Sequence, residues 1–303
     1  MMGEPPAKNT PPVKRKLPPK NATNKIVQAM IPDKKYELST AGIKRGRKII
    51  LYGASGMGKT TLGTMAPKPV FVSVDDGIDV VPNPVTGEPM PRYSVRAYQD
   101  VRGVLAKPDH FKGFETIVLD NMSEVENKAV PYILETVTKD GRAVKSLEGY
   151  GWGAGYQYLA EHDNYVKYDL QRLADLGFNI VVICQMAPRK ETSAEVDEYL
   201  KDGPKLVWRP ASKAYAVTDF VEWADYCFKI GYSNLSVQKK RATSSGERVI
   251  FIHPETTFEA KARDIPAQFP RVSFTDPTDD SIWKFVFEQA WKEIETTSNE
   301  ETA

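Results

Sequence analysis

A glycine-rich motif of eight residues most constrains the fold of this 303-residue chain. Residues 53–60 read Gly-Ala-Ser-Gly-Met-Gly-Lys-Thr and follow the apolar run 48–52. The spacing G-x-x-x-x-G-K-[ST], between a short strand and a helix start, is that of a phosphate-binding loop. Its glycines permit backbone angles that turn consecutive N–H groups inward around phosphate oxygens. The motif therefore predicts a nucleoside-triphosphate site, the alternative being a glycine-rich turn that binds nothing.

Each residue type in the motif has a chemical role in this prediction. Lys59 supplies a positive charge for the β- and γ-phosphates, and Thr60 supplies a hydroxyl for Mg²⁺. The helix that follows points the positive end of its dipole at the anion. We expect ATP and Mg²⁺ as cofactors, because no N-K-x-D guanine-binding element follows a later strand. The residues expected to bind the nucleotide are Gly53, Ala54, Ser55, Gly56, Met57, Gly58, Lys59, Thr60 and Thr61.

The length of the chain suits one large α/β domain with tails, or two small domains. No uninterrupted apolar stretch approaches membrane-spanning length, and the N-terminus has no apolar signal region, so we expect no membrane span and a cytoplasmic location. Cys184 and Cys227 lie in apolar runs and are expected to be buried thiols. His110, His162 and His253 share no ligand spacing with them, which argues against structural zinc.

Charge is distributed unevenly along the chain. Residues 1–48 contain twelve Lys or Arg against three acidic residues, a net charge of +9. The remainder has 29 basic against 37 acidic residues, a net charge of −8. A basic arm and an acidic tail on one chain suggest a polyanionic partner and a competitor for it. The alternative is a pair of solvated tails that keep the protein in solution.

The sequence pattern divides the chain into five segments. Pro, Lys and Asn dominate the first, which is expected to be disordered. Short apolar runs then alternate with helical periodicity, which predicts a mainly parallel α/β sheet flanked by helices, with antiparallel strands added at the C-terminal side. The predicted segments are a basic arm 1–24, a transitional segment 25–47, a nucleotide-binding domain 48–274, a C-terminal helix within 275–294 and an acidic tail 295–303.

Individual elements follow from the same periodicities. Strands are predicted at 48–52, 69–74, 116–119 and 179–184, helices at 122–139 and 156–176, further strands within 221–238 and at 248–252, and a final helix at 277–294. The polar, proline-containing stretch 187–214 is predicted to be a long loop or insertion. The stretch 239–247 is expected to be an exposed connection between two strands.

Polar side chains end three of the predicted strands. Asp120 follows TIVL and is expected to support Mg²⁺, the alternative being a helix cap. Asp75 and Asp76 follow FVSV, where either carboxylate would orient the water that attacks the γ-phosphate, or both form a simple turn. Gln185 follows NIVVIC, where a neutral amide can hydrogen-bond the γ-phosphate and report its loss to the next segment.

Taken together, these motifs resemble a known family. GASGMGKTT, the acidic pair, IVLDN and NIVVICQ look like the core of RecA-like P-loop ATPases. The stretches EWADYCFKI and RVIFIHPETTFEAKARDIPAQFP are similar to the end of a phage family of AAA-type nucleotide-binding proteins, linked to recombination and single-strand annealing. The resemblance spans residues 46–272. It implies a RecA-like fold, Mg²⁺-dependent ATP hydrolysis, and single-stranded DNA binding in phage-type recombination or replication.

The resemblance also implies roles for particular residues. Gln185 would couple nucleotide state to a DNA-binding loop after it. Lys261 and Arg263, in the AKAR element, would reach the γ-phosphate of a neighbouring subunit in a filament or ring; the alternative is two solvated charges. Phage recombination or single-strand-binding proteins would be partners. The family usually has Glu where this chain has Asp75 or Asp76, and the shorter side chain predicts slow turnover.

Several segments are candidates for contact with single-stranded DNA. The segment 139–168 combines basic and aromatic residues among glycines, which suits base stacking. Its candidates are Arg142, Lys145, Tyr150, Trp152, Tyr156 and Tyr158, while core packing is favoured for Tyr158, Tyr165 and Tyr168. The segment 187–214 is a candidate because it follows Gln185. The basic clusters 14–16 and 239–241 would bind phosphates in a salt-dependent manner.

Two other functions are compatible with the motif. A P-loop kinase of a small molecule would have a lid with clustered arginines, which the segment 187–214 resembles only weakly. A non-catalytic, nucleotide-dependent interaction module would use its basic arm to recruit another protein. Stimulation of ATP turnover by DNA distinguishes the DNA-binding ATPase from both.

Overall fold

The fold is taken from a computed structural model that describes residues 45–74, 81–191, 199–206, 216–233, 235–238, 241–244 and 246–294, with the backbone alone described at 216–219, 235–238 and 241–244. All of these residues belong to one unit, Lys44–Ala303. Several predictions lie outside them: the arm 1–24, most of the segment 25–47, Asp75, Asp76, Lys239, Lys240, parts of 187–214 and the tail 295–303.

The centre of the fold is a ten-stranded sheet in which the order of the strands along the main path is β12-β10-β7-β1-β5-β4-β2-β3. The strands β1, β2, β3, β4, β5 and β7 pair in parallel, whereas β10 pairs antiparallel to β7 and β12 antiparallel to β10. This mainly parallel sheet with antiparallel strands at the C-terminal side confirms the predicted fold class. The strands are β1 (Lys48–Gly53), β2 (Pro69–Ser73), β3 (Arg92–Ser94), β4 (Thr116–Asp120), β5 (Asn179–Glu191), β7 (Tyr226–Tyr232), β10 (Arg248–Phe251), β11 (Lys261–Ala262) and β12 (Arg271–Ser273).

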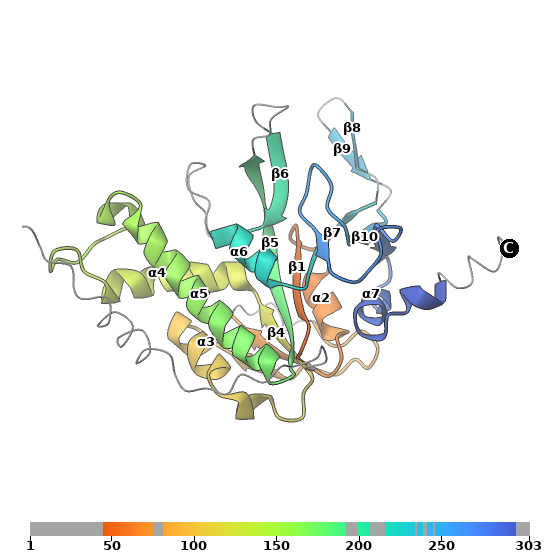
Figure 1. The fold of residues 1–303 in the computed structure, drawn as a ribbon, viewed down its shortest axis with the longest axis horizontal. Helices are drawn as coiled ribbons and strands as arrows, with labels where there is room; N and C mark the ends of the chain where they lie inside the picture. Colours follow the sequence, from red (N-terminus) through yellow and green to blue (C-terminus); the bar gives the residue numbers. More distant parts are fainter. Residues whose placement is uncertain are drawn as a thin grey trace, which may run out of the picture. The chain divides into compact units, whose positions relative to one another are not determined.

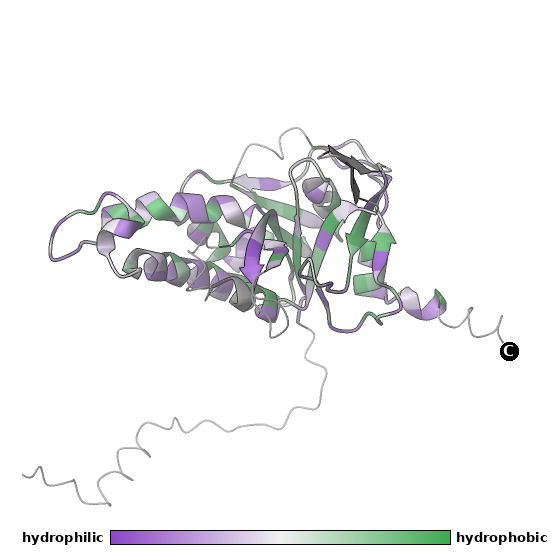
Figure 2. Ribbon diagram, turned by 90° about the horizontal axis from the view of Figure 1, so that it is seen from above, coloured by the Kyte–Doolittle hydropathy of each residue, from purple (hydrophilic) through white to green (hydrophobic). Residues whose placement is uncertain are grey.

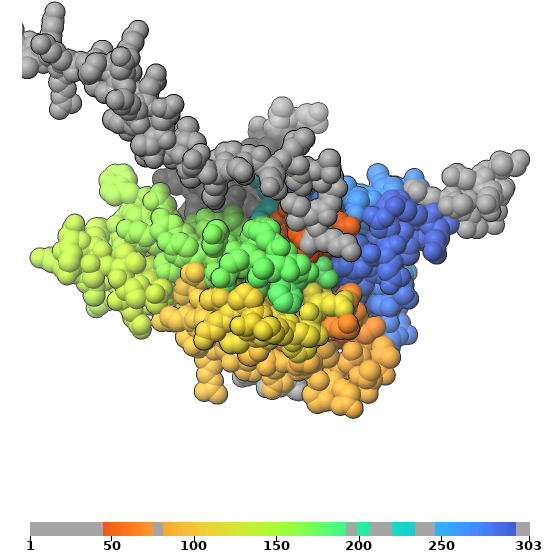
Figure 3. Space-filling view, turned by 60° about the horizontal axis from the view of Figure 1, so that its bottom comes forward, coloured from red at the N-terminus to blue at the C-terminus, as the bar shows by residue number. Residues whose placement is uncertain are grey.

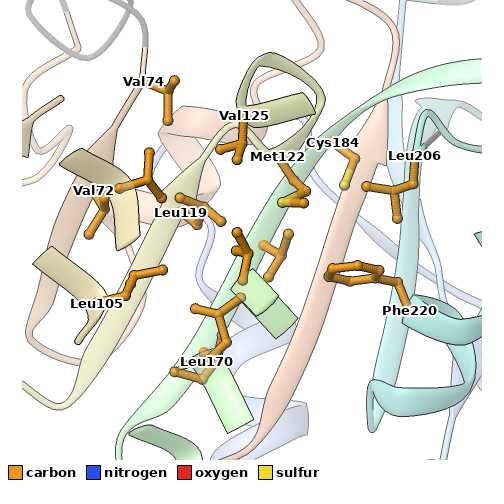
Figure 4. Close-up of a cluster of buried hydrophobic side chains, with 14 of the residues drawn as sticks. Val72, Val74, Leu105, Leu119, Met122, Val125, Leu170, Cys184, Leu206 and Phe220 are labelled. Carbon is orange, nitrogen blue, oxygen red and sulfur yellow. The ribbon is translucent and has the colours of Figure 1, made fainter. Parts of the chain in front are cut away.

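Helices cover both faces of the sheet, so its central strands are apolar on both sides. All six residues of β1 are buried, and residues 49–52 alternate between two hydrophobic clusters, Ile50 and Tyr52 in one and Ile49 and Leu51 in the other. One cluster packs under α3 (Tyr98–Leu105), α4 (Met122–Thr136) and α5 (Ala154–Asp175); Figure 4 shows part of it around Leu119, Leu170 and Cys184. The other packs under α2 (Lys59–Thr64) and the C-terminal segment. In Figure 2 the apolar residues accordingly concentrate in the strands, and the outer faces of the helices are hydrophilic.

The predicted helices are present with somewhat different bounds. The helix predicted over 122–139 is α4, and it begins where the Asn121 side chain accepts a hydrogen bond of 2.8 Å from the backbone N–H of Glu124. The helix predicted over 156–176 is α5. Both cysteines are free and buried, as predicted, and burial raises the pKa of each thiol. Among the helices of the described residues, none is long and apolar enough to cross a membrane.

The prediction of a long loop over 187–214 is wrong in its first half. β5 continues past Gln185 to Glu191 and pairs antiparallel with β6 (Tyr199–Pro204), from Met186 opposite Pro204 to Glu191 opposite Tyr199. This hairpin extends past the neighbouring strands of the sheet (Figure 1), and most of its residues are exposed or half-buried rather than buried on both faces. Its residues are therefore mostly polar, and the sequence lacks the apolar signal of a buried strand.

Two further predictions are corrected. The expected strand over 221–238 begins instead with a helix, α6 (Ala216–Trp223), because Phe220 and Trp223 pack together at helical spacing, with ring centroids 5.9 Å apart. The C-terminal helix predicted over 277–294 is interrupted. It consists of α7 (Ser281–Trp283), a π-helical turn Lys284–Glu288 that ends at Gln289 in the left-handed region, and one more turn at 291–294.

Two hairpins extend from the carboxyl edge of the sheet, on either side of β1. Gly53, the last residue of β1, lies opposite Gln185 of β5 and Ile230 of β7. β5 continues into the β5–β6 hairpin, and β7 is followed by the hairpin of β8 (Leu235–Gln238) and β9 (Arg241–Ser244). Figure 1 shows both hairpins on the same side of the sheet. The segment after Gly53 therefore starts between the bases of two hairpins.

Candidate nucleotide-binding site

The glycine-rich segment 53–58 connects β1 to α2 at the carboxyl edge of the sheet. Gly56 and Gly58 have φ of +75° and +93°, which side-chain-bearing residues rarely adopt. Gly53 is required for a different reason, since a Cβ there would lie 2.5 Å from the backbone oxygen of Ile230 on the adjacent strand. Residues 54–56 are exposed, Met57 is buried, and Thr61 lies in the first turn of α2. The turn thus presents its backbone at an open edge of the sheet.

The side chain of Lys59 folds back over this turn. Its Nζ atom donates hydrogen bonds of 2.9 Å to the carbonyl oxygen of Gly53 and 2.8 Å to that of Ala54. Partial burial lowers the pKa of Lys59, and the Asp120 carboxylate opposes that shift. The ammonium group is therefore held in the concave side of the turn by neutral carbonyls, which an anionic ligand can replace.

The structure brings together the two residues predicted to bind Mg²⁺. The Thr60 hydroxyl donates a hydrogen bond of 2.7 Å to Oδ2 of Asp120, which is the last residue of β4 and is 5% exposed. These residues are 60 positions apart in the sequence and come from opposite sides of β5 in the sheet. A hydroxyl and a carboxylate are hard oxygen ligands of the kind Mg²⁺ prefers, so the pair fits this ion.

Gln185 lies at the start of the β5–β6 hairpin, where a residue that the sequence analysis missed fixes the backbone. Its N–H donates to the Ser123 hydroxyl at 3.1 Å, and this hydroxyl donates to the carbonyl of Lys205 at 2.7 Å. The N–H of Lys205 in turn donates to the carbonyl of Gln185 at 2.7 Å. Ser123 is buried in the first turn of α4, three residues after Asp120. It thus connects the segment after Asp120 to both strands of the hairpin.

Lys261 and Arg263 lie at the other edge of the sheet. Lys261 is paired with Cys227 near the amino end of β7, and its Nζ donates to the carbonyls of Val221 and Glu222 at 2.8 and 2.7 Å. It therefore caps the carboxyl end of α6. Arg263 pairs with Asp225 at 2.9 Å, and its side chain is half exposed. Within one chain neither residue is at the phosphate loop, so their contact with a neighbouring subunit stays a prediction.

Asp75 and Asp76 lie outside the described residues, but the strand before them is placed. Ser73 lies opposite Asp120 in the pairing of β2 with β4, and the N–H of Val74 donates to the Asp120 carbonyl at 2.9 Å. The segment that carries the acidic pair therefore starts directly beside the candidate metal ligand. Its role in orienting water stays a prediction.

The segment between α4 and α5 contains an exposed aromatic residue. Trp152 is 99% exposed and has a φ of +52°, whereas Tyr150 is buried and its hydroxyl donates to the Val137 carbonyl at 2.7 Å. Tyr158 packs on the core, as predicted. Tyr165 and Tyr168 were expected to do so too, but they are 48% and 71% exposed because they lie on the outer face of α5. Lys139, Arg142 and Lys145 line a hollow of about 690 Å³ beside this segment.

Comparison with known proteins matches most of the chain to one family model. A family model described as an AAA domain matches residues 45–263, which include the phosphate loop, Asp120 and Gln185. No curated protein matches the chain. Among solved structures, it is similar to the flagellar accessory protein FlaH from Methanocaldococcus jannaschii, with 10% sequence identity and a TM-score of 0.35 over 69% of this chain and 79% of that one. So distant a likeness carries no argument about function.

Proposed function

Since the chain belongs to the AAA domain family and carries a P-loop ATPase domain, we propose that it hydrolyses ATP with Mg²⁺ and binds single-stranded DNA. The observation that carries the first part is the hydrogen bond between Thr60 and Asp120 at the mouth of the glycine-rich turn. This hydrogen bond places a hydroxyl and a carboxylate, the oxygen ligands that Mg²⁺ prefers, side by side at the start of α2.

In this proposal each residue of the site binds a different part of the triphosphate or its metal ion. Backbone N–H groups of the turn and the start of α2 hold the phosphates, and Lys59 exchanges its bonds to Gly53 and Ala54 for phosphate oxygens. Thr60 and Asp120 would hold Mg²⁺, which neutralises charge on the β- and γ-phosphates when it is bound. Asp75 or Asp76 orients the attacking water in this proposal, and turnover is slow because Asp is shorter than Glu.

Single-stranded DNA is proposed to contact the β5–β6 hairpin and the segment around Trp152. The hairpin begins at Gln185, whose backbone is tied through Ser123 to the segment that follows Asp120. Loss of the γ-phosphate near Gln185 can therefore change the position of the hairpin. Trp152 offers an exposed ring for stacking, and it follows Gly151, where an added Cβ would lie 3.3 Å from Nζ of Lys139. Together with the resemblance to phage recombination ATPases, these features favour a role in recombination or replication.

A second subunit would complete the site in this proposal. Lys261 and Arg263 lie at the amino edge of the sheet, away from the phosphate loop of their own chain. If chains stack with the amino edge of one against the carboxyl edge of the next, Arg263 reaches the neighbour's γ-phosphate in the manner of an arginine finger. A filament or ring is the assembly that such head-to-tail contacts form.

The experiment that tests the proposal is ATP turnover with and without single-stranded DNA, at low and moderate salt. The Lys59→Ala variant serves as the blank, because it lacks the cation that contacts the phosphates. Turnover that DNA stimulates, and that the variant abolishes, supports the proposal. Turnover that is indifferent to DNA favours a P-loop kinase, and tight nucleotide binding without turnover favours a non-catalytic switch.

A further inference from the structure

An arginine from the antiparallel part of the sheet contacts the phosphate loop of its own chain. Arg248 opens β10, and its Nη1 atom lies 3.4 Å from the carbonyl oxygen of Met57, inside the glycine-rich turn. Its Nη2 atom donates to the carbonyl of Thr275 at 3.2 Å. The guanidinium lies over the ring of Phe274, 5.2 Å from the centroid. Arg248 and Met57 are 191 positions apart in the sequence.

This contact shapes the turn itself. A Cβ at Gly58 would lie 2.9 Å from Nη1 of Arg248 and 2.9 Å from the ring of Phe274. The buried Phe274 ring therefore disfavours a side chain at position 58, in addition to the φ of +93°. Around it the C-terminal segment packs on α2, where the Trp283 indole donates to the Leu62 carbonyl at 2.9 Å. In Figure 3 the C-terminal residues, in blue, accordingly lie against the orange-red residues of β1 and α2.

The bonds that Arg248 makes leave it available to a ligand. Its two hydrogen bonds are longer than the usual 2.9–3.0 Å or so, and a guanidinium carries five N–H donors. Within the described residues no carboxylate pairs with it, and its side chain is partly exposed. One face rests on Phe274, and a planar cation of this kind also stacks on other flat ring systems.

The topology indicates which end of a nucleotide would meet Arg248. Asp120 and Thr60 mark the metal and γ-phosphate end, and Asp120 belongs to β4, on the β5 side of β1. With the γ-phosphate end beside Thr60 and Asp120, the nucleoside lies at the other end of the triphosphate, away from Asp120. Arg248 and Phe274 lie on the opposite side of β1, beyond β7. This side of the turn is therefore the place for a ribose and base.

We propose that Arg248 recognises the nucleoside end of the bound nucleotide, stacking its guanidinium on the base while Phe274 supports the other face. The inference rests on the proposed nucleotide binding and adds to it a residue from outside the motif. Stacking of this kind is tolerant of base identity, so ATP and GTP would both gain from it.

The test compares ligands that have and lack a nucleoside. Binding of ATP, ADP and inorganic tripolyphosphate, each with Mg²⁺, would be measured by competition with a fluorescent ATP analogue. Arg248→Ala is expected to weaken ATP and ADP about tenfold, in the range of a cation–π contact, and to change tripolyphosphate less than twofold. Arg248→Lys should recover part of the loss. Arg271→Ala is the matched control, because Arg271 donates to the carbonyl of Ser233 on the same part of the sheet.

Two results would overturn the inference. An equal loss of ATP and tripolyphosphate would mean that Arg248 acts only by holding the phosphate loop, and unchanged binding of ATP would mean that it has no role. Thermal unfolding of each variant identifies a loss caused by misfolding, in which case Arg248→Lys and Arg248→Gln are compared instead. If the wild-type chain binds neither ATP nor tripolyphosphate, the proposed nucleotide binding itself fails. This outcome is distinct from a failure of the inference about Arg248, because it is measured on the wild-type chain alone.

Discussion

The two edges of the central sheet hold their charges in different ways. At the carboxyl edge, Lys59 donates to neutral carbonyls and Asp120 accepts from the Thr60 hydroxyl, contacts that a ligand can exchange. At the amino edge, Asp225 is almost fully buried, accepts the N–H of Lys48 at 3.1 Å, and pairs with Arg45 and Arg263. The charged groups of the first edge have contacts that the proposed nucleotide and metal can replace, whereas Asp225 at the second edge is paired within the chain.

The largest expected effect tests whether Lys261 and Arg263 at the amino edge only stabilise the fold or also take part in ATP hydrolysis. In an assembly, Lys261→Ala/Arg263→Ala should lower ATP turnover by about a thousandfold, because an arginine finger contributes that much in related chemistry. Turnover would be measured at protein concentrations that support assembly. Arg45→Ala is the control, since it removes an ion pair with the same oxygen of Asp225 but leaves the AKAR element intact. A double variant that hydrolyses ATP like the wild type would leave only a structural role.

At the carboxyl edge, Asp120→Asn should lower ATP turnover by about a hundredfold, as expected for the loss of one group that stabilises developing charge. The amide keeps the shape of the side chain but not the negative charge that the metal requires. Turnover would be titrated with Mg²⁺ to detect a higher requirement. Asp109→Asn, at an exposed carboxylate that pairs with Lys112, is the control. Unaltered turnover and Mg²⁺ dependence would argue against a metal role for Asp120.

The same substitution at the amino edge should affect stability instead. Asp225→Asn should lower the free energy of unfolding by about 2 kcal/mol, less than for a fully buried pair because its arginine partners are about half exposed. Nucleotide affinity of the unassembled chain should not change, since among the described residues Asp225 contacts Lys48, Arg45 and Arg263, which lie outside the phosphate loop. Denaturant unfolding measures the expected loss of stability, and nucleotide titration checks that affinity is unchanged. A loss of affinity without a loss of stability would contradict the division between the edges.

A smaller effect is expected from Ser123, which connects the carboxyl edge to the β5–β6 hairpin. Ser123→Ala leaves the N–H of Gln185 and the carbonyl of Lys205 without their shared partner, a cost of about 1–3 kcal/mol if neither finds water. We expect the ratio of DNA affinities with ATP and with ADP to fall about fivefold, while nucleotide affinity is kept. Ser233→Ala, whose hydroxyl contacts Glu247, is the control. A ratio unchanged from wild type would exclude Ser123 from the coupling.

The smallest expected effect lies outside both edges. Trp152→Ala should weaken single-stranded DNA binding about fivefold, near the low end of one base–aromatic stack. Stability should not fall, because the side chain is 99% exposed and its φ of +52° is unfavourable for Trp. Fluorescence anisotropy with a labelled oligonucleotide measures the affinity, and Trp152→Phe should restore most of it. The control is Tyr168→Ala on the exposed face of α5, and equal losses for both variants would indicate a nonspecific surface effect.

The sequence predicted best those elements whose signal is local. The apolar runs at 48–52 and 116–119 are β1 and β4, because a strand buried on both faces must be apolar throughout. It missed α3 and β3, and it took the β5–β6 hairpin for a loop, since the half-buried positions of the hairpin are mostly polar or charged and give no apolar pattern. It took the start of 221–238 for a strand because Val and Trp favour strands, whereas packing of Phe220 and Trp223 selected a helix.

By itself the sequence determined the phosphate loop, because its glycines and its Lys-Thr pair act within eight consecutive residues and their backbone requirements are local. It also indicated Asp120, whose place at the end of a strand follows from a short apolar run. Only the tertiary structure decided that Thr60 meets Asp120, that Ser123 joins both strands of the hairpin and that Arg248 reaches Met57. These contacts join residues 60 to 191 positions apart, and the order of strands in the sheet, rather than any local preference, sets such distances.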